Sequence, residues 1–384
     1  MFTYHLPTKI IFGQPALEAL ANELDLLEAK RILLVSDPGL ADIGLVERIE
    51  VGLSNEGRAI VAFTEVSSNP TSTEVAAGLT LARELQAQAI IALGGGSPID
   101  VGKGIAMLMA NGGVYADYQW SGKAITRRSL PLLAVPTTAG TGSEVSKVAV
   151  IVDPDRPFKK GVLSPHMFPH AAIADPELTR SLPAWLTAAT GMDAFIHALE
   201  AYTGRRANPY TDMLALAALE TVWWALPEAV ADGEDMAARE AMMLAALWAG
   251  TAMDHGGLGL IHSLSGPLTG QFHLHHGLTN AILLPPILRF NLPAIAPERR
   301  ARLKQTFGLA PTAADEALVN ALARFVADLG LPTSLSEIAD LSTLDDPATR
   351  DAIVEDTLRM AMTPNNPRQV TADDVETLLL AQCR

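Results

Sequence analysis

Residues 87–108 read AQAIIALGGGSPIDVGKGIAML and carry the strongest fold signal in the chain. The apolar run at 89–93 is typical of a strand buried on both faces of a parallel sheet. The three glycines that follow allow a tight turn and let a ligand approach the backbone. Ser97 and Asp100 then fit the N-cap and N3 positions of a helix, with Pro98 at N1. The stretch therefore predicts a strand, a turn and a helix whose N-terminus can hold a phosphate.

This turn matches neither of the two common phosphate-binding motifs. It is not G-x-G-x-x-G, and it lacks the GK[ST] of a P-loop. Glycine-rich turns between a strand and a helix also occur for packing alone. The turn by itself leaves phosphate binding and packing open. Lys103, one turn beyond Asp100, fits a solvated helix residue as well as a ligand contact.

Short β-rich runs alternate with helical patterns around this stretch. The expected strands are residues 31–36, 58–63, 89–94, 130–136 and 148–153. Such alternation predicts a parallel sheet with helical crossovers. From about Leu182 onward strand signals almost vanish, which predicts an all-helical region. We therefore expect an α/β dinucleotide-binding domain at 1–181 and an all-helical metal- and substrate-binding domain at 182–384. Ligand sites usually lie in clefts, and we expect such a cleft between these two domains.

Bulk composition indicates a globular protein. The 384 residues are 49% hydrophobic and 18% charged, enough for two domains with cores. The net charge of −15 argues against nucleic acid and anionic membranes as partners. A single cysteine, Cys383, excludes an internal disulfide and fits a cytoplasmic location. The N-terminus lacks signal-peptide features, and the apolar stretch at 241–253 is shorter than the ~20 residues that span a bilayer.

A carboxylate and three imidazoles form the clearest chemical pattern. Asp193 and His197 are four residues apart in TAATGMDAFIHALEAY, so they share one face of a predicted helix. His262 and His276 follow in IHSLSGPLTGQFHLHHGLTN. Together the four would complete the ligand shell of a divalent transition metal. The Asp/His pair alone is equally compatible with an ordinary hydrogen-bonded pair, and a single histidine is more often a core or surface residue.

Four motifs in this order resemble the iron-containing (group III) alcohol dehydrogenases. They are GGGSPIDVGK, PTTAGTGSE at 136–144, the 175–202 stretch that holds the Asp/His pair, and the spaced histidines. LPTKIIFG near the start and NNPRQVTADDVETLL near the end also resemble that family, so the resemblance covers essentially the whole chain. It implies the same two-domain fold, with a dinucleotide in the α/β half and a metal in the helical half.

The resemblance implies a nicotinamide dinucleotide as cofactor. Asp37 follows the strand at 31–36, where a carboxylate bonds a ribose and repels a 2′-phosphate, so NAD is expected and NADP is less so. The sequence Asp37-Pro38-Gly39 is equally compatible with a simple turn. Lys159 and Lys160 are adjacent, so either of them fits the lysine position that the resemblance implies. The expected cofactor-binding residues are Asp37, Gly94, Gly95, Gly96, Ser97, Asp100, Thr137, Thr138, Ser143 and Lys159.

The implied reaction is reversible hydride transfer between a nicotinamide and an alcohol or aldehyde held at the metal. Family resemblance favours Fe(II), whereas affinity alone would favour Zn(II). Alternatives within the same fold are enzymes resembling glycerol dehydrogenase or maleylacetate reductase. More remote is a lyase resembling dehydroquinate synthase, whose phosphorylated substrate needs a basic pocket that this helical half lacks. The partner is a small alcohol or aldehyde, with no nucleic acid and no membrane. An apolar N-terminal hairpin favours a homodimer or higher homo-oligomer.

Two departures from the family pattern affect the chemistry. Many members carry a histidine four residues after the third ligand, whereas this chain has Gly266, which cannot relay a proton and would enlarge the pocket. This chain also has His255 in DHGGLG where the family usually has asparagine. His255 is therefore a candidate catalytic residue, although a structural role at the helix end is equally compatible. Among the clustered histidines, His276 fits the ligand position best, and His273 and His275 are expected to lie around it or at the surface.

Overall fold

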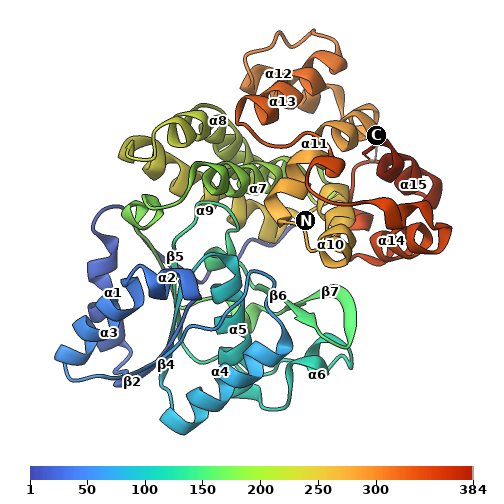
Figure 1. The fold of residues 1–384 in the computed structure, drawn as a ribbon. Helices are drawn as coiled ribbons and strands as arrows, with labels where there is room; N and C mark the ends of the chain where they lie inside the picture. The colour runs from blue at the N-terminus through green and yellow to red at the C-terminus, as the bar shows by residue number, and fades with distance from the viewer. Residues whose placement is uncertain (383–384) are drawn as a thin grey trace. The chain divides into compact units, whose positions relative to one another are not determined.

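The computed structural model describes residues 1–382, except for the side chains of residues 156–159 (Figure 1). Contacts between residues divide the chain into two compact units. One is His5–Arg180, and the other joins Met1–Tyr4 to Ser181–Arg384. The expected boundary lay after residue 181 and kept the N-terminal residues with the α/β half. The structure instead places the first four residues with the helical unit.

The α/β unit is built on a six-stranded sheet in the order β1-β8-β5-β4-β2-β3. Every pairing in it is parallel, as the strand–helix alternation predicted. The strands are β1 Lys9–Phe12, β2 Arg31–Val35, β3 Ala59–Phe63, β4 Ala89–Gly94, β5 Leu132–Pro136 and β8 Ala171–Ala174. The two strands of this sheet that the sequence did not predict, β1 and β8, are short and lie beside each other.

One predicted strand lies outside this sheet. Residues 148–153 form β6 (Val148–Asp153), which pairs antiparallel with β7 (Arg156–Leu163) in a separate two-stranded ribbon. Burial alternates along β6, as expected for a strand with one face in solvent, whereas every residue of β4 is buried. The predicted N-terminal hairpin is also absent from the described residues, because β1 pairs parallel with β8.

Side chains alternate along the strands and form a core on each face of the sheet. Leu33 and Val35 pack with residues of α4 and α5, whereas Ile32 and Leu34 pack with residues of α1 and α3. Helices therefore cover both faces (Figure 1). The helices of this unit are α1 Ala19–Leu26, α2 Pro38–Asp42, α3 Leu45–Asn55, α4 Ser72–Leu85, α5 Gly96–Asn111 and α6 Tyr115–Gln119.

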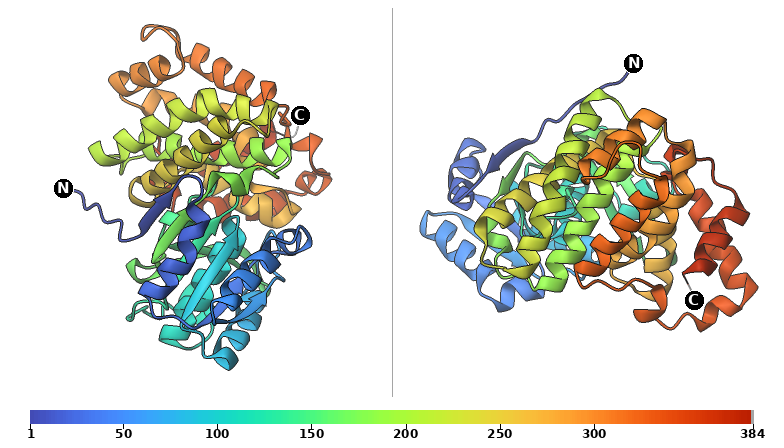
Figure 2. Two further views of the ribbon diagram at one scale, coloured as in Figure 1. Left: turned by 90° about the vertical axis from the view of Figure 1, so that its left-hand side faces the viewer. Right: turned by 90° about the horizontal axis from the view of Figure 1, so that it is seen from above.

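From residue 181 to residue 382 the chain forms helices and no strand, which confirms the predicted all-helical half (Figure 2). Its α-helices are α7 Ala184–Thr203, α8 Pro209–Ala231, α9 Met236–Gly256, α10 Leu260–Phe272, α11 His276–Asn291, α12 Pro297–Thr306, α13 Asp315–Asp328, α14 Pro347–Arg359 and α15 Ala372–Ala381. Single turns of 3-10 helix occur in both units. They are η1 Ala16–Glu18, η2 Ser143–Val145, η3 Pro165–Met167, η4 Pro176–Thr179, η5 Leu292–Ala294, η6 Leu335–Glu337, η7 Ser342–Asp345 and η8 Thr363–Asn365.

Helix α8 is long and apolar enough to cross a membrane by length and composition alone. In the helical unit it packs against α7 and α9. Leu219, Val222 and Leu226 are fully buried in that packing. One face of α8 thus contributes to the core of this unit, whereas 39% of its apolar window is buried in all and Met213 and Trp224 are exposed.

Candidate functional site

Three predicted cofactor segments meet at one edge of the parallel sheet. Asp37 follows β2, the glycine turn follows β4, and Thr137 follows β5, and these three strands are neighbours. The Thr137 backbone N–H donates to the Gly94 carbonyl at 3.0 Å, which ties the last two segments together. Ligands of open α/β sheets bind outside the carboxyl ends of the strands. The edge formed by β2, β4 and β5 is therefore the candidate nucleotide site.

The glycine turn is packed tightly against the loop that follows β5. Gly94 has φ of +145°, a conformation that side chains rarely adopt. A Cβ added to Gly95 would lie 3.4 Å from Thr138, and one added to Gly96 would lie 2.9 Å from Thr141. The glycines therefore serve packing as well as leaving the helix N-terminus uncovered by side chains. The packing interpretation, which the sequence left open, explains part of the motif.

The start of α5 differs from the prediction. The helix begins at Gly96 with Gly95 as N-cap, so Ser97 is not the N-cap. The Ser97 hydroxyl instead donates to the Ser68 carbonyl at 2.9 Å. Asp100 accepts hydrogen bonds from the Ser143 hydroxyl at 2.6 Å and from the Val150 backbone N–H at 2.8 Å. The predicted N-cap role of Ser97 and N3 role of Asp100 are therefore wrong, because both side chains bond segments remote in sequence.

Lys103 is neither solvated nor exposed to a ligand. Its side chain is fully buried, and its ammonium donates to the Ser143 hydroxyl at 2.8 Å, the Ser146 hydroxyl at 3.2 Å and the Val148 carbonyl at 2.7 Å. It anchors the loop after β5 to α5. Glu144 lies in the same buried region, where desolvation raises the pKa of its carboxyl to about 7 although the Lys103 charge opposes this shift.

Asp37 has two roles in the structure. Its Oδ1 accepts a hydrogen bond from the Leu40 backbone N–H at 3.1 Å and caps α2. Its Oδ2 faces the glycine turn, since a Cβ on Gly94 would lie 3.2 Å from it. Burial raises the pKa of this carboxyl, and the backbone N–H groups of Leu40 and Gly39 partly offset that shift. The turn and cofactor interpretations of Asp37 are thus compatible.

Lys159 lies in β7, opposite Val152. Its side chain is outside the described part of the structure. Its predicted contact with the cofactor therefore stays a prediction.

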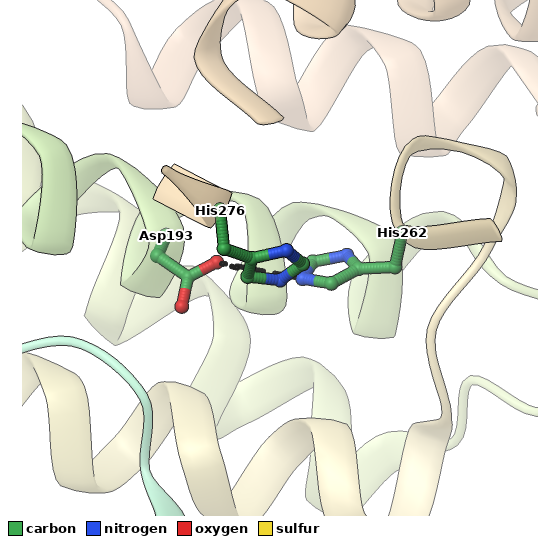
Figure 3. Close-up of side chains that lie close together, drawn as sticks. All are labelled: Asp193, His262 and His276. Atoms are coloured by element: carbon green, nitrogen blue, oxygen red, sulfur yellow. Dashed lines mark ion pairs between the residues drawn. The ribbon is translucent and has the colours of Figure 1, made fainter. Parts of the chain in front are cut away.

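The four predicted metal ligands converge within the helical unit. Asp193 and His197 come from α7, His262 from α10, and His276 from the first residue of α11. The Asp193 Oδ1 lies 3.7 Å from His197 Nε2, 3.5 Å from His262 Nε2 and 3.8 Å from His276 Nε2. Figure 3 shows this oxygen turned toward the rings of His262 and His276. One carboxylate oxygen therefore faces three imidazole nitrogens.

These distances fit a metal site. In a tetrahedral site with bonds of about 2.1 Å, neighbouring ligand atoms lie roughly 3.4 Å apart. Donor atoms of Asp193, His262 and His276 all lie within 4.8 Å of one another. The ring of His197 stacks on that of His262, with centroids 4.8 Å apart. Three nitrogens and one oxygen form a donor set that Fe(II) and Zn(II) both accept.

Asn280, which sequence reasoning did not assign to the site, marks the point on which the donor atoms converge. Its side-chain Nδ2 lies 2.8 Å from Asp193 Oδ1, 3.2 Å from His262 Nε2 and 3.1 Å from His276 Nε2. An amide N–H₂ carries two protons, so it cannot donate to all three acceptors at once. Its own Oδ1 is buried without a hydrogen-bond partner among the described residues. The lone pairs thus face a shared position that suits a cation.

The charges around this point are strongly coupled. Burial alone would raise the pKa of Asp193, but the neighbouring imidazoles of His197, His262 and His276 hold it far below its usual range. Burial would also lower the pKa of His262, but hydrogen bonds to Asp193 and Glu200 raise it to about 9. A buried carboxylate of this kind needs a positive partner, which a divalent cation would supply.

Small residues let the ligand-bearing helices approach each other. A Cβ on Gly277 would lie only 2.2 Å from the Ala189 carbonyl oxygen, so α11 meets the backbone of α7 directly. This approach carries His276 to Asp193, one turn further along α7. The glycine that directly follows His276 therefore has a packing reason. His275 is the N-cap of α11, and His273 is exposed.

The contacts of His255 belong to a different region. Its Nδ1 lies 2.9 Å from the Thr251 carbonyl oxygen, and its ring stacks on Tyr4 with centroids 4.5 Å apart. Tyr4 in turn stacks on Tyr210 of α8 at 5.0 Å. None of these partners belongs to the metal-ligand cluster, so the contacts support a role in holding the N-terminal segment. A role in proton transfer stays a prediction.

The space directly beside Gly266 is occupied by Met360. Gly266 lies one turn after His262 on α10, and a Cβ added to it would lie 2.6 Å from the Cε of Met360. Met360, at the C-cap of α14, therefore fills the space of the missing side chain. The expectation that Gly266 enlarges the pocket stays a prediction, and Met360 places an apolar group beside this position.

Two family models cover most of the chain. Residues 7–176 match "Iron-containing alcohol dehydrogenase", and residues 187–383 match "Fe-containing alcohol dehydrogenase family, C-terminal". The NAD-dependent methanol dehydrogenase of Bacillus methanolicus is 36% identical over 388 residues, which cover 99% of each chain. The 1,3-propanediol dehydrogenase of Citrobacter freundii is 38% identical, over 91% of this chain and 93% of the relative. A crystal structure of a 1,3-propanediol oxidoreductase superimposes with a TM-score of 0.92 at 35% identity and covers both chains fully.

Proposed function

The chain belongs to the iron-containing alcohol dehydrogenase family, and from this premise we propose that it is an NAD-dependent dehydrogenase whose metal is held by Asp193, His197, His262 and His276. The observation that carries the proposal is that Asp193 Oδ1 lies 3.5–3.8 Å from a nitrogen of each imidazole, while donor atoms of Asp193, His262 and His276 lie within 4.8 Å of one another. They come from three helices that are far apart in the sequence. Their coincidence at one point, around a position suited to a cation, supports a site rather than unrelated histidines.

A divalent metal in this position would polarise a substrate carbonyl and lower the pKa of a substrate alcohol. The protein residues supply the geometry. The buried Asp193 carboxylate provides the negative charge that selects a cation, and the imidazoles fix its distance from the helices. The His276 side chain is the most exposed of the four, at 42%, compared with 4–6% for the others. Access to the site is therefore expected on the His276 side.

The residues around the glycine turn are proposed to hold NAD. The N-terminus of α5 offers free backbone N–H groups to a pyrophosphate. Asp37 Oδ2 faces the same turn, so it can accept a hydrogen bond from a ribose hydroxyl and repel the 2′-phosphate of NADP. The name of the NAD-dependent relative supports the same preference. When bound, the nicotinamide accepts or gives the hydride.

The proposed substrate is a small primary alcohol or the corresponding aldehyde. Two of the relatives are named for short alcohols, methanol and 1,3-propanediol, and the proposal follows these two, although another is named a long-chain-alcohol dehydrogenase. Met360 beside Gly266 adds an apolar surface next to the helix that bears His262. The relay of the proton then falls to groups other than residue 266, because glycine has no side chain to carry one. We also propose a cytoplasmic location and a homodimer or higher homo-oligomer.

The test combines metal analysis with an activity assay. Protein purified without oxygen is analysed for Fe and Zn, and NADH oxidation is followed with short aldehydes before and after chelation. We expect about one metal ion per chain, and loss of both metal and activity in His262→Ala. His273→Asn is the matched control, because it removes an exposed imidazole and asparagine tolerates its left-handed backbone at φ 53°. Full NADH turnover without metal, under any loading, would refute the ligand assignment.

A further inference from the structure

Glu200 is a buried carboxylate that the proposed reaction does not yet use. It lies three residues after His197 and seven after Asp193 on α7, so the three share one helical face. Only 4% of Glu200 is exposed. A buried acidic residue requires hydrogen-bond partners for both of its oxygens, because burying an unpaired charge is costly. The partners of Glu200 are therefore informative.

All described hydrogen bonds to the Glu200 carboxylate come from one place, the start of α10. Its Oε2 lies 2.7 Å from His262 Nδ1 and accepts from the Gly259 backbone N–H at 2.9 Å. Its Oε1 accepts from the Ile261 backbone N–H at 2.7 Å. These N–H groups belong to the end of a helix where no partner within the helix is available. One carboxylate therefore closes the helix end and also contacts the ring of His262.

The local backbone is shaped to admit this carboxylate. A Cβ on Gly259 would lie 3.0 Å from Glu200 Oε1, so a larger residue would crowd the contact. The N-terminus of a helix also carries partial positive charge, which favours an anionic partner. The glycine at position 259 and the start of α10 thus together accommodate the Glu200 carboxylate in close contact.

The contact with His262 determines which ring nitrogen is free. An ionised carboxylate can only accept hydrogen bonds, so the His262 Nδ1 must carry a proton. In the neutral ring that binds a metal, the lone pair is then on Nε2, the nitrogen that lies 3.5 Å from Asp193 Oδ1. Metal-binding histidines commonly bond a carboxylate through the other ring nitrogen, which fixes both tautomer and orientation.

We propose that Glu200 is a positioning residue for the metal site, which presents His262 Nε2 as a ligand by holding both the imidazole and the first turn of α10. The inference rests on the proposed function, because it assumes that a metal binds at this cluster. An amide at position 200 cannot replace the carboxylate. One half of an amide is a donor, so glutamine cannot accept from Gly259, Ile261 and His262 together.

Asn366 offers a matched control at the same helix end. Its Oδ1 accepts from the Leu260 backbone N–H at 3.2 Å, and the other described bonds of its side chain join Asn291 and Arg368. Asn366→Ala therefore removes support from the start of α10 without removing the partner of the His262 ring. A purely structural role of Glu200 would make the two variants behave alike.

The experiment measures Zn(II) binding to metal-free wild type, Glu200→Gln and Asn366→Ala by competition with a chelator. The absorption spectrum of Co(II) in each protein and thermal unfolding without metal are recorded alongside. We expect Glu200→Gln to weaken Zn(II) binding by about 10- to 100-fold and to change the Co(II) spectrum. Asn366→Ala should lower the melting temperature but keep Zn(II) affinity within about threefold of wild type.

Each outcome bears on a separate statement. Wild-type affinity and an unchanged Co(II) spectrum in Glu200→Gln would overturn the role of Glu200 and leave the metal site intact. Equal weakening in Glu200→Gln and Asn366→Ala would also overturn it, in favour of a structural role. Failure of wild type itself to bind Zn(II) or Co(II) would refute the proposed function. If Glu200→Gln does not fold, Glu200→Asp is used, since it keeps the charge but shortens the reach. It should weaken Zn(II) binding at least tenfold, and wild-type affinity would contradict the proposal.

Discussion

At the scale of single residues, side chains that looked like local caps or surface groups have longer-range partners. Lys103 bonds the loop after β5 from inside the core, and Asp100 bonds Ser143 and Val150 rather than its own helix end. Asp37 is the exception, because it keeps the local cap predicted by its turn sequence and still faces the glycine turn. Spacing identifies these residues as important, but their partners come from the fold.

The charge of Asp37 should determine the choice between NAD and NADP. Asp37→Ser keeps a side-chain acceptor for the Leu40 backbone N–H but removes the charge that repels a 2′-phosphate. We expect the ratio of kcat/KM for NADP to that for NAD to rise at least about tenfold, which corresponds to ~1.4 kcal/mol. Asp42→Ser, at the exposed end of the same helix, is the control and should leave the ratio unchanged. An unchanged ratio in Asp37→Ser would remove Asp37 from the cofactor site.

Glu144 should make the α/β unit less stable as the pH rises. Its pKa is raised from 4.5 to about 7 by burial, so between these values the folded chain keeps a proton that the unfolded chain has lost. The free energy of unfolding therefore falls by on the order of 3 kcal/mol between about pH 4.5 and pH 7. Above pH 7 it stays at this lower value.

Chemical denaturation of wild type and Glu144→Gln from pH 5 to pH 8 tests this expectation. The glutamine variant cannot ionise, so its stability should lose that slope and exceed wild type at pH 8. Glu84→Gln, which changes an exposed carboxyl of α4, serves as the comparison and should follow wild type. Parallel pH profiles for all three proteins would argue against a buried neutral Glu144.

At the scale of elements, close backbone contact between α7 and α11 builds the metal-ligand cluster. No periodicity in either helix predicts that contact, although the glycine after His276 permits it. The contact at Gly277 leaves no room for a methyl group, since a Cβ would lie 2.2 Å from the Ala189 carbonyl oxygen. The opposing atom belongs to backbone, which cannot turn aside like a flexible side chain.

Gly277→Ala should therefore destabilise the helical unit and disturb the cluster together. We expect a loss of at least about 1–3 kcal/mol in the free energy of unfolding and weaker Zn(II) binding, because α11 must move away from α7. Gly52→Ala in α3, where nothing lies within 4 Å of an added Cβ, should be neutral or stabilising by about 0.5–1 kcal/mol. Denaturant unfolding and chelator competition measure both effects. If Gly277→Ala is destabilised but binds Zn(II) as tightly as wild type, the close packing of α7 against α11 is not required for metal binding. That result would contradict this prediction.

At the scale of the whole molecule, the proposed metal and cofactor residues lie in different units. All four candidate ligands are in the helical unit, and the candidate NAD residues are in His5–Arg180. A ligand that binds only folded protein stabilises it, by about 2.7 kcal/mol when present at 100 times its Kd. Each ligand should therefore first protect the unit that binds it.

Hydrogen exchange can resolve the two effects. Zn(II) should slow exchange in α7, α10 and α11, and NAD should slow exchange around the glycine turn and the loop after β5. Asp193→Asn should abolish the Zn(II) effect and leave the NAD effect in place. Protection by Zn(II) confined to the α/β unit would contradict the assignment of the cluster.

The sequence alone determined the features that depend on neighbouring residues. The apolar run and glycine turn at 87–108 predicted a strand, a turn and a helix, and all three are present in the fold. The spacing of Asp193 and His197 placed both on one helical face, and the parallel sheet followed from strand–helix alternation. The family followed from four ordered motifs. Such signals are readable because backbone period and turn chemistry depend on local residue type.

Only the tertiary structure determined what depends on contacts between distant segments. It placed β6 outside the sheet, filled the space at Gly266 with Met360, and buried Lys103 under the loop after β5. It also joined Glu200 to His262 across 62 positions in the chain. Packing in a folded interior depends on complementary shape and paired polar groups, whichever part of the chain supplies them. Spacing along the chain carries no such information, so these contacts could not be predicted from it.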